Sequence, residues 1–234
     1  MTDTLVHGCG PVKIIAIHGI QGTNRVWLAL AERLSSHCTF ILPNLPGRGN
    51  GTPYTQADMT LASFADVIEN TVKQYINDDE PYCLAGWSMG VSVALKFVAR
   101  RRVARPQKLM LLSGVPDIGK VSWFAQRTES ALLNEIGERE QRLNLLAAAE
   151  HRAVMWTWQA IANTSLAQEC ASVTMPCLIL TGEKDEDSPL AQVSSFRRLI
   201  PGSALRTIAN AGHSILTENT ETVSTELAEF LNLE

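Results

Sequence analysis

The stretch Tyr82-Cys83-Leu84-Ala85-Gly86-Trp87-Ser88-Met89-Gly90 decides the fold of this 234-residue chain. Its first four residues form an apolar run of strand length, and the apolar pattern from Met89 onward is helical. Ser88 therefore lies on a sharp strand-to-helix turn, where Gly86 and Gly90 let the strand and the helix approach closely. Such a turn lifts the serine hydroxyl above a sheet and points the amino terminus of the helix at the same place.

Short apolar runs alternate with longer amphipathic segments on both sides of this turn. The predicted strands are Lys13–Ile17, Thr39–Leu42, Tyr82–Ala85, Lys108–Leu112, Cys177–Thr181 and Ala204–Ile208. The predicted helices are Arg25–Leu34, Leu61–Ile76, Met89–Arg102 and Thr217–Leu233. The alternation indicates βαβ units, so we expect an α/β fold with a mainly parallel sheet and helices on both faces.

One long segment interrupts this alternation, because residues 113–176 contain no convincing strand. Its pattern predicts helices over Glu129–Gly137, Glu140–Ala149 and Arg152–Ile161. Open α/β sheets bind their ligands at the carboxyl ends of the strands. We therefore expect residues 115–175 to form a short helical cap insert over a site there, and residues 1–114 and 176–234 to form one core domain.

Composition excludes several classes of protein. Hydrophobic residues make up 45% of the chain and charged residues 19%, which is typical of a globular protein with a full core. The net charge of −4 argues against a nucleic-acid partner. No apolar run resembles a signal peptide or a membrane span. The five cysteines show no metal-binding spacing, so we expect reduced thiols in a cytoplasmic protein and no metal site.

Ser88 needs a base before its hydroxyl becomes a good nucleophile. Of the five histidines, His213 has the most suitable position, in a loop after the last predicted strand and before the closing helix. Such a loop opens at the carboxyl end of the sheet, where Ser88 is also expected. His151 falls in the insert and is expected to be structural, while His7 and His37 have no catalytic context.

A carboxylate must orient the imidazole and stabilise its protonated form. Asp185 follows the fifth predicted strand, and the order Ser88, Asp185, His213 is the nucleophile–acid–histidine order of one known fold. Asp117, after the fourth strand, and Asp187, two residues beyond Asp185, are the alternatives.

Two backbone amides are candidates for an oxyanion hole. The first is the amide of Met89, at the start of its helix, and the second is that of Ile20, in the turn His18-Gly19-Ile20-Gln21-Gly22. His18 would then hold the turn rather than transfer a proton. The alternative is that this turn only connects a strand to a helix.

Aromatic residues near the site are candidates for binding the substrate. Trp87 adjoins Ser88 and is expected to form a wall of the acyl pocket. Four aromatic residues of the insert would more often be packed between helices, but at least one is expected to line the pocket: Trp123, Phe124, Trp156 and Trp158. A short insert has little apolar surface left for a long tunnel, so we expect short to medium acyl groups.

Five stretches occur in the order found in one family: His18-Gly19, Asn44-Leu45-Pro46-Gly47-Arg48-Gly49, Gly86–Gly90, Gly182–Asp185 and Gly212-His213. In these stretches the chain resembles the α/β-hydrolase superfamily. The resemblance implies the α/β-hydrolase fold and cleavage of a carboxylic ester, thioester or related bond by a Ser-His-Asp triad. It also implies that no metal or organic cofactor takes part.

Within the superfamily the chain most resembles the pimeloyl-acyl-carrier-protein methyl ester esterases and the small carboxylesterases around them. This implies a small-molecule ester substrate, with a methyl ester on an acyl-carrier protein as a narrower choice. The basic cluster Arg100, Arg101, Arg102 and Arg105 is expected to be a solvated helix end, with the docking of an acidic carrier protein as the lesser alternative. The alternatives are an acyltransferase, a thioesterase, a carbon–carbon hydrolase and a non-catalytic ligand-binding receptor.

Overall fold

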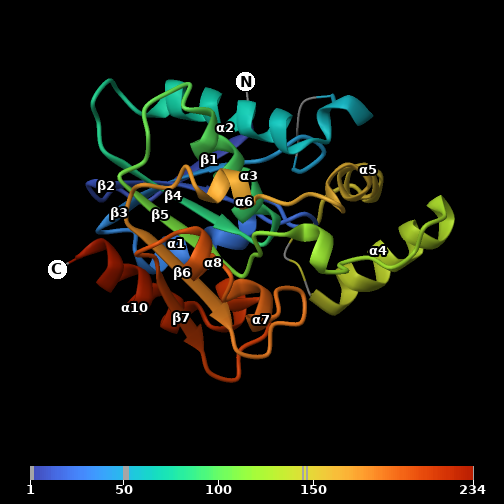
Figure 1. Cartoon of the computed structure of the whole chain (residues 1–234). Coiled ribbons are helices and arrows are strands. Elements are labelled where there is room, and N and C mark those ends of the chain that lie inside the picture. The colour runs from blue at the N-terminus through green and yellow to red at the C-terminus, as the bar shows by residue number, and fades with distance from the viewer. Residues whose placement is uncertain (1–2, 50–52, 144, 146, 234) are drawn as a thin grey trace.

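The computed structural model describes residues 3–49, 53–143, 145 and 147–233. The seven strands of the described residues form one sheet in the order β1-β3-β2-β4-β5-β6-β7 (Figure 1). The strands are β1 (Thr4–His7), β2 (Val12–Ile17), β3 (Cys38–Pro43), β4 (Tyr82–Trp87), β5 (Lys108–Leu112), β6 (Cys177–Gly182) and β7 (Ala204–Ile208). All pairs are parallel except β1 with β3. The predicted mainly parallel α/β fold is therefore confirmed.

Strand β1 is the one strand that the sequence pattern did not predict. It has only four residues, and Leu5 and Val6 are both exposed, so no apolar alternation marks it. Its partners come from β3, with Leu5 opposite Leu42 and Val6 opposite Ile41. The strand forms because the edge of β3 offers unpaired backbone groups, which is a tertiary cause.

Helices cover both faces of the sheet (Figure 1). Along β2, Ile15 and Ile17 pack into the core on one face, while Ile14 and Ala16 pack into the core on the other. This alternation follows from the two-residue period of a strand. The helices on the first face are α2 (Leu61–Tyr75), α3 (Met89–Arg100), α6 (Ala167–Cys170), α7 (Leu190–Val193) and α8 (Phe196–Leu199). Those on the second are η1 (Asn24–Trp27), α1 (Leu28–Arg33), α9 (Ile215–Glu218) and α10 (Thr220–Leu231).

The segment between β5 and β6 is helical, as the sequence predicts, and the helix predicted over Arg152–Ile161 is confirmed, but the two before it differ. Helix α4 runs without interruption over Glu129–Leu143, and α5 covers His151–Ile161. The prediction of separate helices over Glu129–Gly137 and Glu140–Ala149 was therefore wrong. Leu132, Ile136 and Arg139 keep one face of α4 buried across Gly137. Residues 147–149 are not helical, and residues 144 and 146 lie outside the described part of the chain.

This segment lies across the carboxyl ends of β2 and β3. The amide of Ala149 donates a hydrogen bond of 2.8 Å to the carbonyl of Gln21, which follows β2. The amide of Glu150 donates one of 3.1 Å to the carbonyl of Gly47, which follows β3. These contacts hold α4 and α5 over the strand ends where the sequence predicts a site.

None of the helices in the described ranges is long and apolar enough to cross a membrane. All five cysteines are free thiols, and four of them are buried. Burial raises the pKa of Cys38 and Cys177 to about 12, so these thiols stay protonated at neutral pH.

The close contact of β4 and α3 makes a testable prediction for stability. A Cβ atom on Gly86 would lie 2.3 Å from the Gly90 carbonyl oxygen, and one on Gly90 would lie 2.3 Å from that of Ile17. We expect Gly90→Ala to lower the free energy of unfolding by about 1–3 kcal/mol, measured by urea denaturation. Gly137→Ala in α4 is the control. Its Cβ would make an ordinary 3.5 Å contact, and the change should raise stability by up to about 1 kcal/mol. Equal effects of the two changes would contradict this account.

Candidate active site

Ser88 occupies the turn between β4 and α3 in a backbone conformation that is rare for a residue with a side chain. Its φ is 57° and its ψ is −122°. Such strain persists only where the surrounding structure imposes it, and it is common at reacting residues. The geometry places the Ser88 hydroxyl at the carboxyl edge of the sheet, next to the amino terminus of α3.

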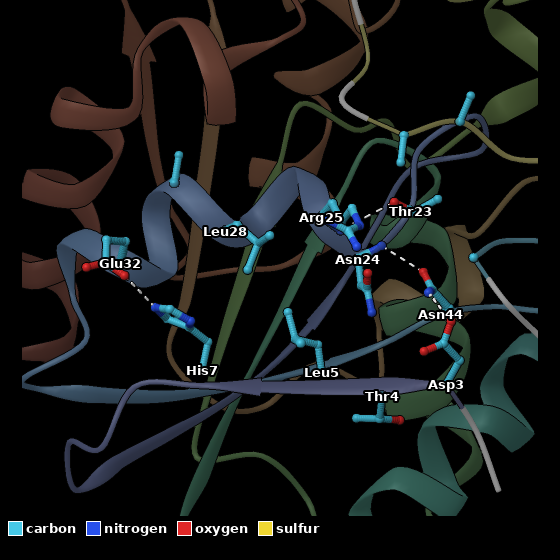
Figure 2. Close-up of a pocket in the computed structure, with 14 residues that line it drawn as sticks. Asp3, Thr4, Leu5, His7, Thr23, Asn24, Arg25, Leu28, Glu32 and Asn44 are labelled. Atoms are coloured by element: carbon cyan, nitrogen blue, oxygen red, sulfur yellow. Dashed lines mark hydrogen bonds and ion pairs between the residues drawn. The ribbon is translucent and has the colours of Figure 1, made fainter.

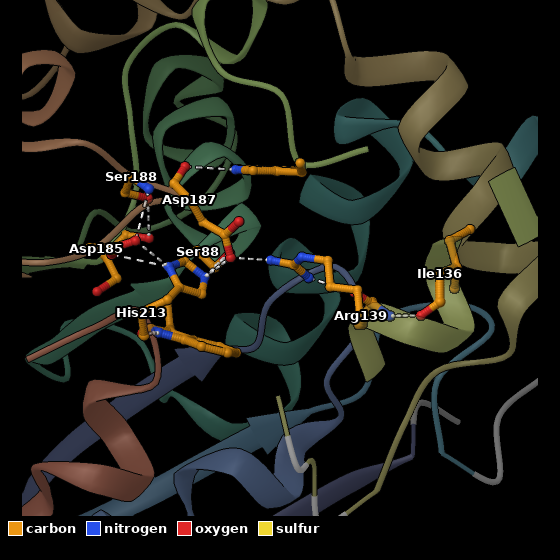
Figure 3. A network of polar contacts seen from close by, with 11 residues as sticks. Ser88, Ile136, Arg139, Asp185, Asp187, Ser188 and His213 are labelled. Atoms are coloured by element: carbon orange, nitrogen blue, oxygen red, sulfur yellow. Dashed lines mark hydrogen bonds and ion pairs between the residues drawn. The ribbon is translucent and has the colours of Figure 1, made fainter. Parts of the chain in front are cut away.

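His213 and Asp185 lie in hydrogen-bonding range of each other, and His213 reaches Ser88 (Figure 3). His213 Nε2 is 3.0 Å from Ser88 Oγ, and His213 Nδ1 is 2.9 Å and 3.0 Å from the two carboxylate oxygens of Asp185. All three side chains are buried. With its proton on Nδ1, the imidazole donates to Asp185 and leaves Nε2 free to accept from the serine hydroxyl.

Asp185 is ionised at neutral pH. Burial opposes its charge, but the hydrogen bonds from His213 and from the Ser188 amide outweigh burial and hold the pKa of Asp185 below its usual range. The Ser188 amide donates to Asp185 Oδ1 at 2.8 Å, which also fixes the orientation of the carboxylate. A carboxylate held in this way can orient an imidazole and stabilise its protonated form.

Neither of the two alternative acids pairs with Nδ1 of His213, the nitrogen that Asp185 contacts. Asp117 forms an ion pair of 3.4 Å with Lys120. Asp187 lies at the other nitrogen of His213, with 3.8 Å between Oδ2 and Nε2, and it pairs with Arg139 of α4. Sequence reasoning missed Arg139, although a signal was present: Arg139 is the one charged residue in the buried stripe of α4 that Leu132 and Ile136 begin.

The predicted oxyanion amides flank Ser88. Ile20 lines the space beside Ser88, and the Met89 amide is the first of α3, so it has no acceptor within its own helix. His18 supports the turn that carries Ile20. His18 Nδ1 forms a hydrogen bond of 2.8 Å with the Gly19 carbonyl oxygen, and Nε2 accepts one of 3.1 Å from the Leu45 amide.

A buried arginine, Arg48, also supports this turn. Arg48 donates to the carbonyl oxygens of Pro46 and Ile20, each at 2.8 Å, and its guanidinium lies 5.3 Å from the centre of the Phe64 ring. Burial lowers the pKa of Arg48 to about 9, which leaves it protonated at neutral pH. The bond to Ile20 ties the turn after β3 to the turn after β2, and the bond to Pro46 holds Arg48 within its own turn.

His18 makes a prediction for the pH dependence of stability. Burial, with a smaller contribution from Arg48, lowers its pKa from 6.5 to about 3, so the folded protein holds the ring neutral. Between these two values the unfolded chain binds more protons than the folded one, so stability is full above about pH 6.5 and is lost as the pH falls. The free energy of unfolding should drop by about 3 kcal/mol from pH 7 to pH 4 on account of this residue.

The comparison for this prediction is His18→Gln, which keeps a donor and an acceptor without a titrating ring. The variant should flatten the pH dependence measured by urea denaturation, whereas a change of the exposed His37 to Gln should not. If His18→Gln keeps the full slope, another group causes the acid sensitivity.

The space beside Ser88 is tight and has no room for a water molecule. Trp87, predicted to form a pocket wall, lines it, and the Trp87 indole donates to the carbonyl of His213 at 3.1 Å. The full set of lining residues is Ile20, Gln21, Gly22, Trp87, Ser88, Arg139, Leu143, Leu145 and His213. Even a small acyl group therefore reaches Ser88 only when some of these side chains move.

The four aromatic residues of the insert lie outside that lining set. The rings of Trp123 and Phe124 each pack 5.6 Å from the ring of Trp158, and all three residues are buried in the core. Trp156 packs at the edge of Tyr54 instead. Their predicted role in binding the substrate therefore stays a prediction for a conformation in which the cap has moved.

A second, wider cavity opens on the surface between β1 and the η1–α1 segment (Figure 2). His7 pairs with Glu32 at one end of it, and Asn44 donates to Asp3 at the other. It shares no lining residue with the space beside Ser88. Within the described ranges, no group of three His, Cys, Asp or Glu side chains is placed to hold a metal ion.

The comparisons with known proteins agree with this geometry. A family model described as the alpha/beta hydrolase family matches residues 14–226. The chain belongs to the alpha/beta hydrolase family. An AB hydrolase superfamily protein of Bacillus subtilis, YisY, is 28% identical over 209 residues, which are 76% of this chain and 78% of that protein. The chain is thus an α/β hydrolase, as the sequence motifs indicated.

Two further relatives carry names that include an activity. A pimeloyl-[acyl-carrier protein] methyl ester esterase of Xylella fastidiosa is 24% identical over 97% of both chains. The solved structure of an esterase from Exiguobacterium antarcticum superimposes with a TM-score of 0.83, at 19% identity, over 98% of this chain and 94% of that one. The second likeness shows the fold alone. The chain is therefore a hydrolase that resembles esterases over nearly its whole length.

Proposed function

We propose that this alpha/beta hydrolase cleaves carboxylic esters through an acyl-enzyme on Ser88, with His213 as the base and Asp185 as the acid that orients it. The observation that carries the proposal is the continuous chain of hydrogen bonds from Ser88 through His213 to Asp185, built on a strained turn at the amino terminus of α3. The esterase names of the relatives support the ester bond as the one that is cleaved.

The reaction has two halves. Ser88 Oγ attacks the acyl carbon while His213 Nε2 takes the hydroxyl proton, and the carboxylate of Asp185 stabilises the imidazolium. The amides of Ile20 and Met89 donate to the oxyanion that develops. His213 then gives the proton to the leaving alcohol. A water molecule, deprotonated by His213, attacks the acyl-enzyme, releases the acid and restores Ser88.

The substrate class in this proposal is a small-molecule ester with a short to medium acyl group. The short helical segment between β5 and β6 supports this choice, because it has little apolar surface to spare for a long acyl tunnel. The names of the Xylella relatives support a carrier-linked methyl ester as the narrower choice, with an acyl-carrier protein as partner. In both cases residues 115–175 act as the cap that selects the acyl chain.

The experiment that tests the function is a hydrolysis assay on p-nitrophenyl and methyl esters of increasing chain length. Reaction with a fluorophosphonate, followed by peptide mass analysis, identifies the nucleophile. We expect acetyl to hexanoyl esters to be the best substrates and the label to be on Ser88. No ester hydrolysis, or label on another residue of active protein, would contradict the proposal.

An acyltransferase, a thioesterase and a carbon–carbon hydrolase would use the same three side chains. Product analysis separates them, because a transferase makes a new ester or amide when an alcohol or amine is present. A non-catalytic receptor would bind esters without turnover, and the hydrogen-bonded Ser88, His213 and Asp185 argue against it.

A further inference from the structure

A second carboxylate lies close to the nitrogen of His213 that faces the serine. Asp187 Oδ2 is 3.8 Å from His213 Nε2, the atom that is also 3.0 Å from Ser88 Oγ. Figure 3 shows the imidazole between this carboxylate and that of Asp185. A negative charge at this distance favours a protonated imidazole, and a protonated imidazole cannot accept the proton of Ser88.

Arg139 compensates this charge from the cap side. Its guanidinium forms an ion pair with Asp187 Oδ2, and the arginine side chain is only 3% exposed. The guanidinium carbon lies 5.4 Å from the centre of the Phe124 ring, which fixes its plane. Charges buried in this way are screened far less than charges on a surface, so the positive charge of Arg139 opposes the effect of the Asp187 charge on His213.

The same arginine connects the cap to both sides of the candidate site. It donates to the side chain of Gln21, and Gln21 donates in turn to the backbone of Ile136 on α4 at 2.8 Å. On the other side, the indole of Trp123 donates to the backbone carbonyl of Asp187 at 2.9 Å. Asp187 is therefore held by two residues of the 115–175 segment, both of which come from outside the sheet.

Other charged groups share a groove with His213. They are Lys184 and Glu186 in the loop after β6, Arg142 on α4 and Glu218 on α9, which line the outer groove with Asp187. Among the described residues, the carboxylates of Asp185 and Asp187 are the ones that form an ion pair with the His213 ring within 4.0 Å. Of these two, only Asp187 lies on the Nε2 side.

We propose that Arg139 is a positioning residue for catalysis: by pairing with Asp187 it keeps His213 Nε2 unprotonated and hydrogen-bonded to Ser88. This inference rests on the proposed roles of Ser88 and His213. It means that the closed cap contributes to the rate itself as well as to the choice of substrate.

The test uses p-nitrophenyl acetate, an ester with a two-carbon acyl group, and measures kcat and KM from pH 5 to pH 9. In Arg139→Met the aliphatic packing on Phe124 is retained while the charge is lost. The acid limb of the kcat profile should move to higher pH by about one unit or more, because the charge of Asp187 is now uncompensated. At pH 6 kcat should fall about tenfold and recover at higher pH, while KM changes little.

Three further variants distinguish this role from simple support of the cap. Asp187→Asn leaves Arg139 without its carboxylate, so the limb should move in the opposite direction, to lower pH. The double variant Arg139→Met/Asp187→Asn should return the acid limb of the kcat profile close to its wild-type position. Arg142→Met, on the same helix but exposed, should leave the profile in place, because solvent screens its charge.

Two results would overturn the inference. One is a rate loss in Arg139→Met with no movement of the acid limb, and the other is a double variant as impaired as the single one. Either would mean that the pair only supports the cap. If Arg139→Met does not fold, the direction of the shift in Asp187→Asn decides the question. Failure of the proposed function is a separate outcome, since the wild type would then show no hydrolysis that depends on Ser88.

Discussion

Replacing Ser88 with alanine should lower kcat for ester hydrolysis by about 10³-fold or more. The change removes the only atom that forms the acyl-enzyme, while substrate binding and the oxyanion amides remain. Residual activity would come from these alone, as direct attack by water. The measurement is steady-state hydrolysis of a short p-nitrophenyl ester, with reaction of the variant and the wild type with a fluorophosphonate followed by intact mass.

Ser92→Ala is the matched control, because Ser92 is buried one turn further along α3. It should keep most of the wild-type kcat and react with the fluorophosphonate. A Ser88→Ala protein that hydrolyses esters at the wild-type rate would exclude Ser88 as the nucleophile. Loss of activity in both variants with unfolding of both would instead point to damage of α3, which circular dichroism detects.

Asp185→Asn should reduce kcat by up to about 10⁴-fold, the size of the loss when the carboxylate of a serine-protease triad becomes an amide. The amide group of asparagine would donate to His213 Nδ1 and force the ring proton onto Nε2. Ser88 would then face a donor instead of an acceptor. The measurement is kcat on the same ester, with the melting temperature recorded to confirm folding.

Asp187→Asn and Asp117→Asn are the comparisons for this change. Asp117 pairs with Lys120, so its variant should stay within about twofold of the wild type, as for a surface carboxylate. Asp187→Asn should change kcat by about tenfold at most, in the pH-dependent way described for Arg139. If Asp117→Asn is the inactive variant while Asp185→Asn is active, the acid of the triad lies after β5 and the assignment is wrong.

The local pattern was enough to predict most of the sheet. Five of the six parallel strands are short, mostly buried and apolar, and such a strand leaves a continuous run that can be read without knowing its neighbours; the exception is the edge strand β7. Strand β1 has no such run and exists only because β3 offers it an edge. The end of the first cap helix was likewise decided by packing, since Gly137 looks like a break in the sequence but lies in the interior of α4.

The candidate site, too, was predicted in part by the sequence and decided in part by the tertiary structure. Ser88, Asp185 and His213 could be predicted because each follows a strand of a parallel sheet, and the carboxyl ends of such strands meet at one edge. The distances of 2.9–3.0 Å between their side chains depend on the tertiary structure. The narrow space beside Ser88, with Trp123, Phe124 and Trp158 packed away from it, depends on it as well.

The sequence by itself therefore determined the α/β fold, the family and the three residues proposed for catalysis, because each has a local signature at a strand end. Only the tertiary structure decided that Arg139 and Asp187 lie over His213, 48 residues apart in the chain. An ion pair between distant residues has no sequence period, since it depends on how α4 packs over the loop after β6. Because Arg139 and Asp187 are shielded from water, their charges act more strongly on His213 than charges on the surface would.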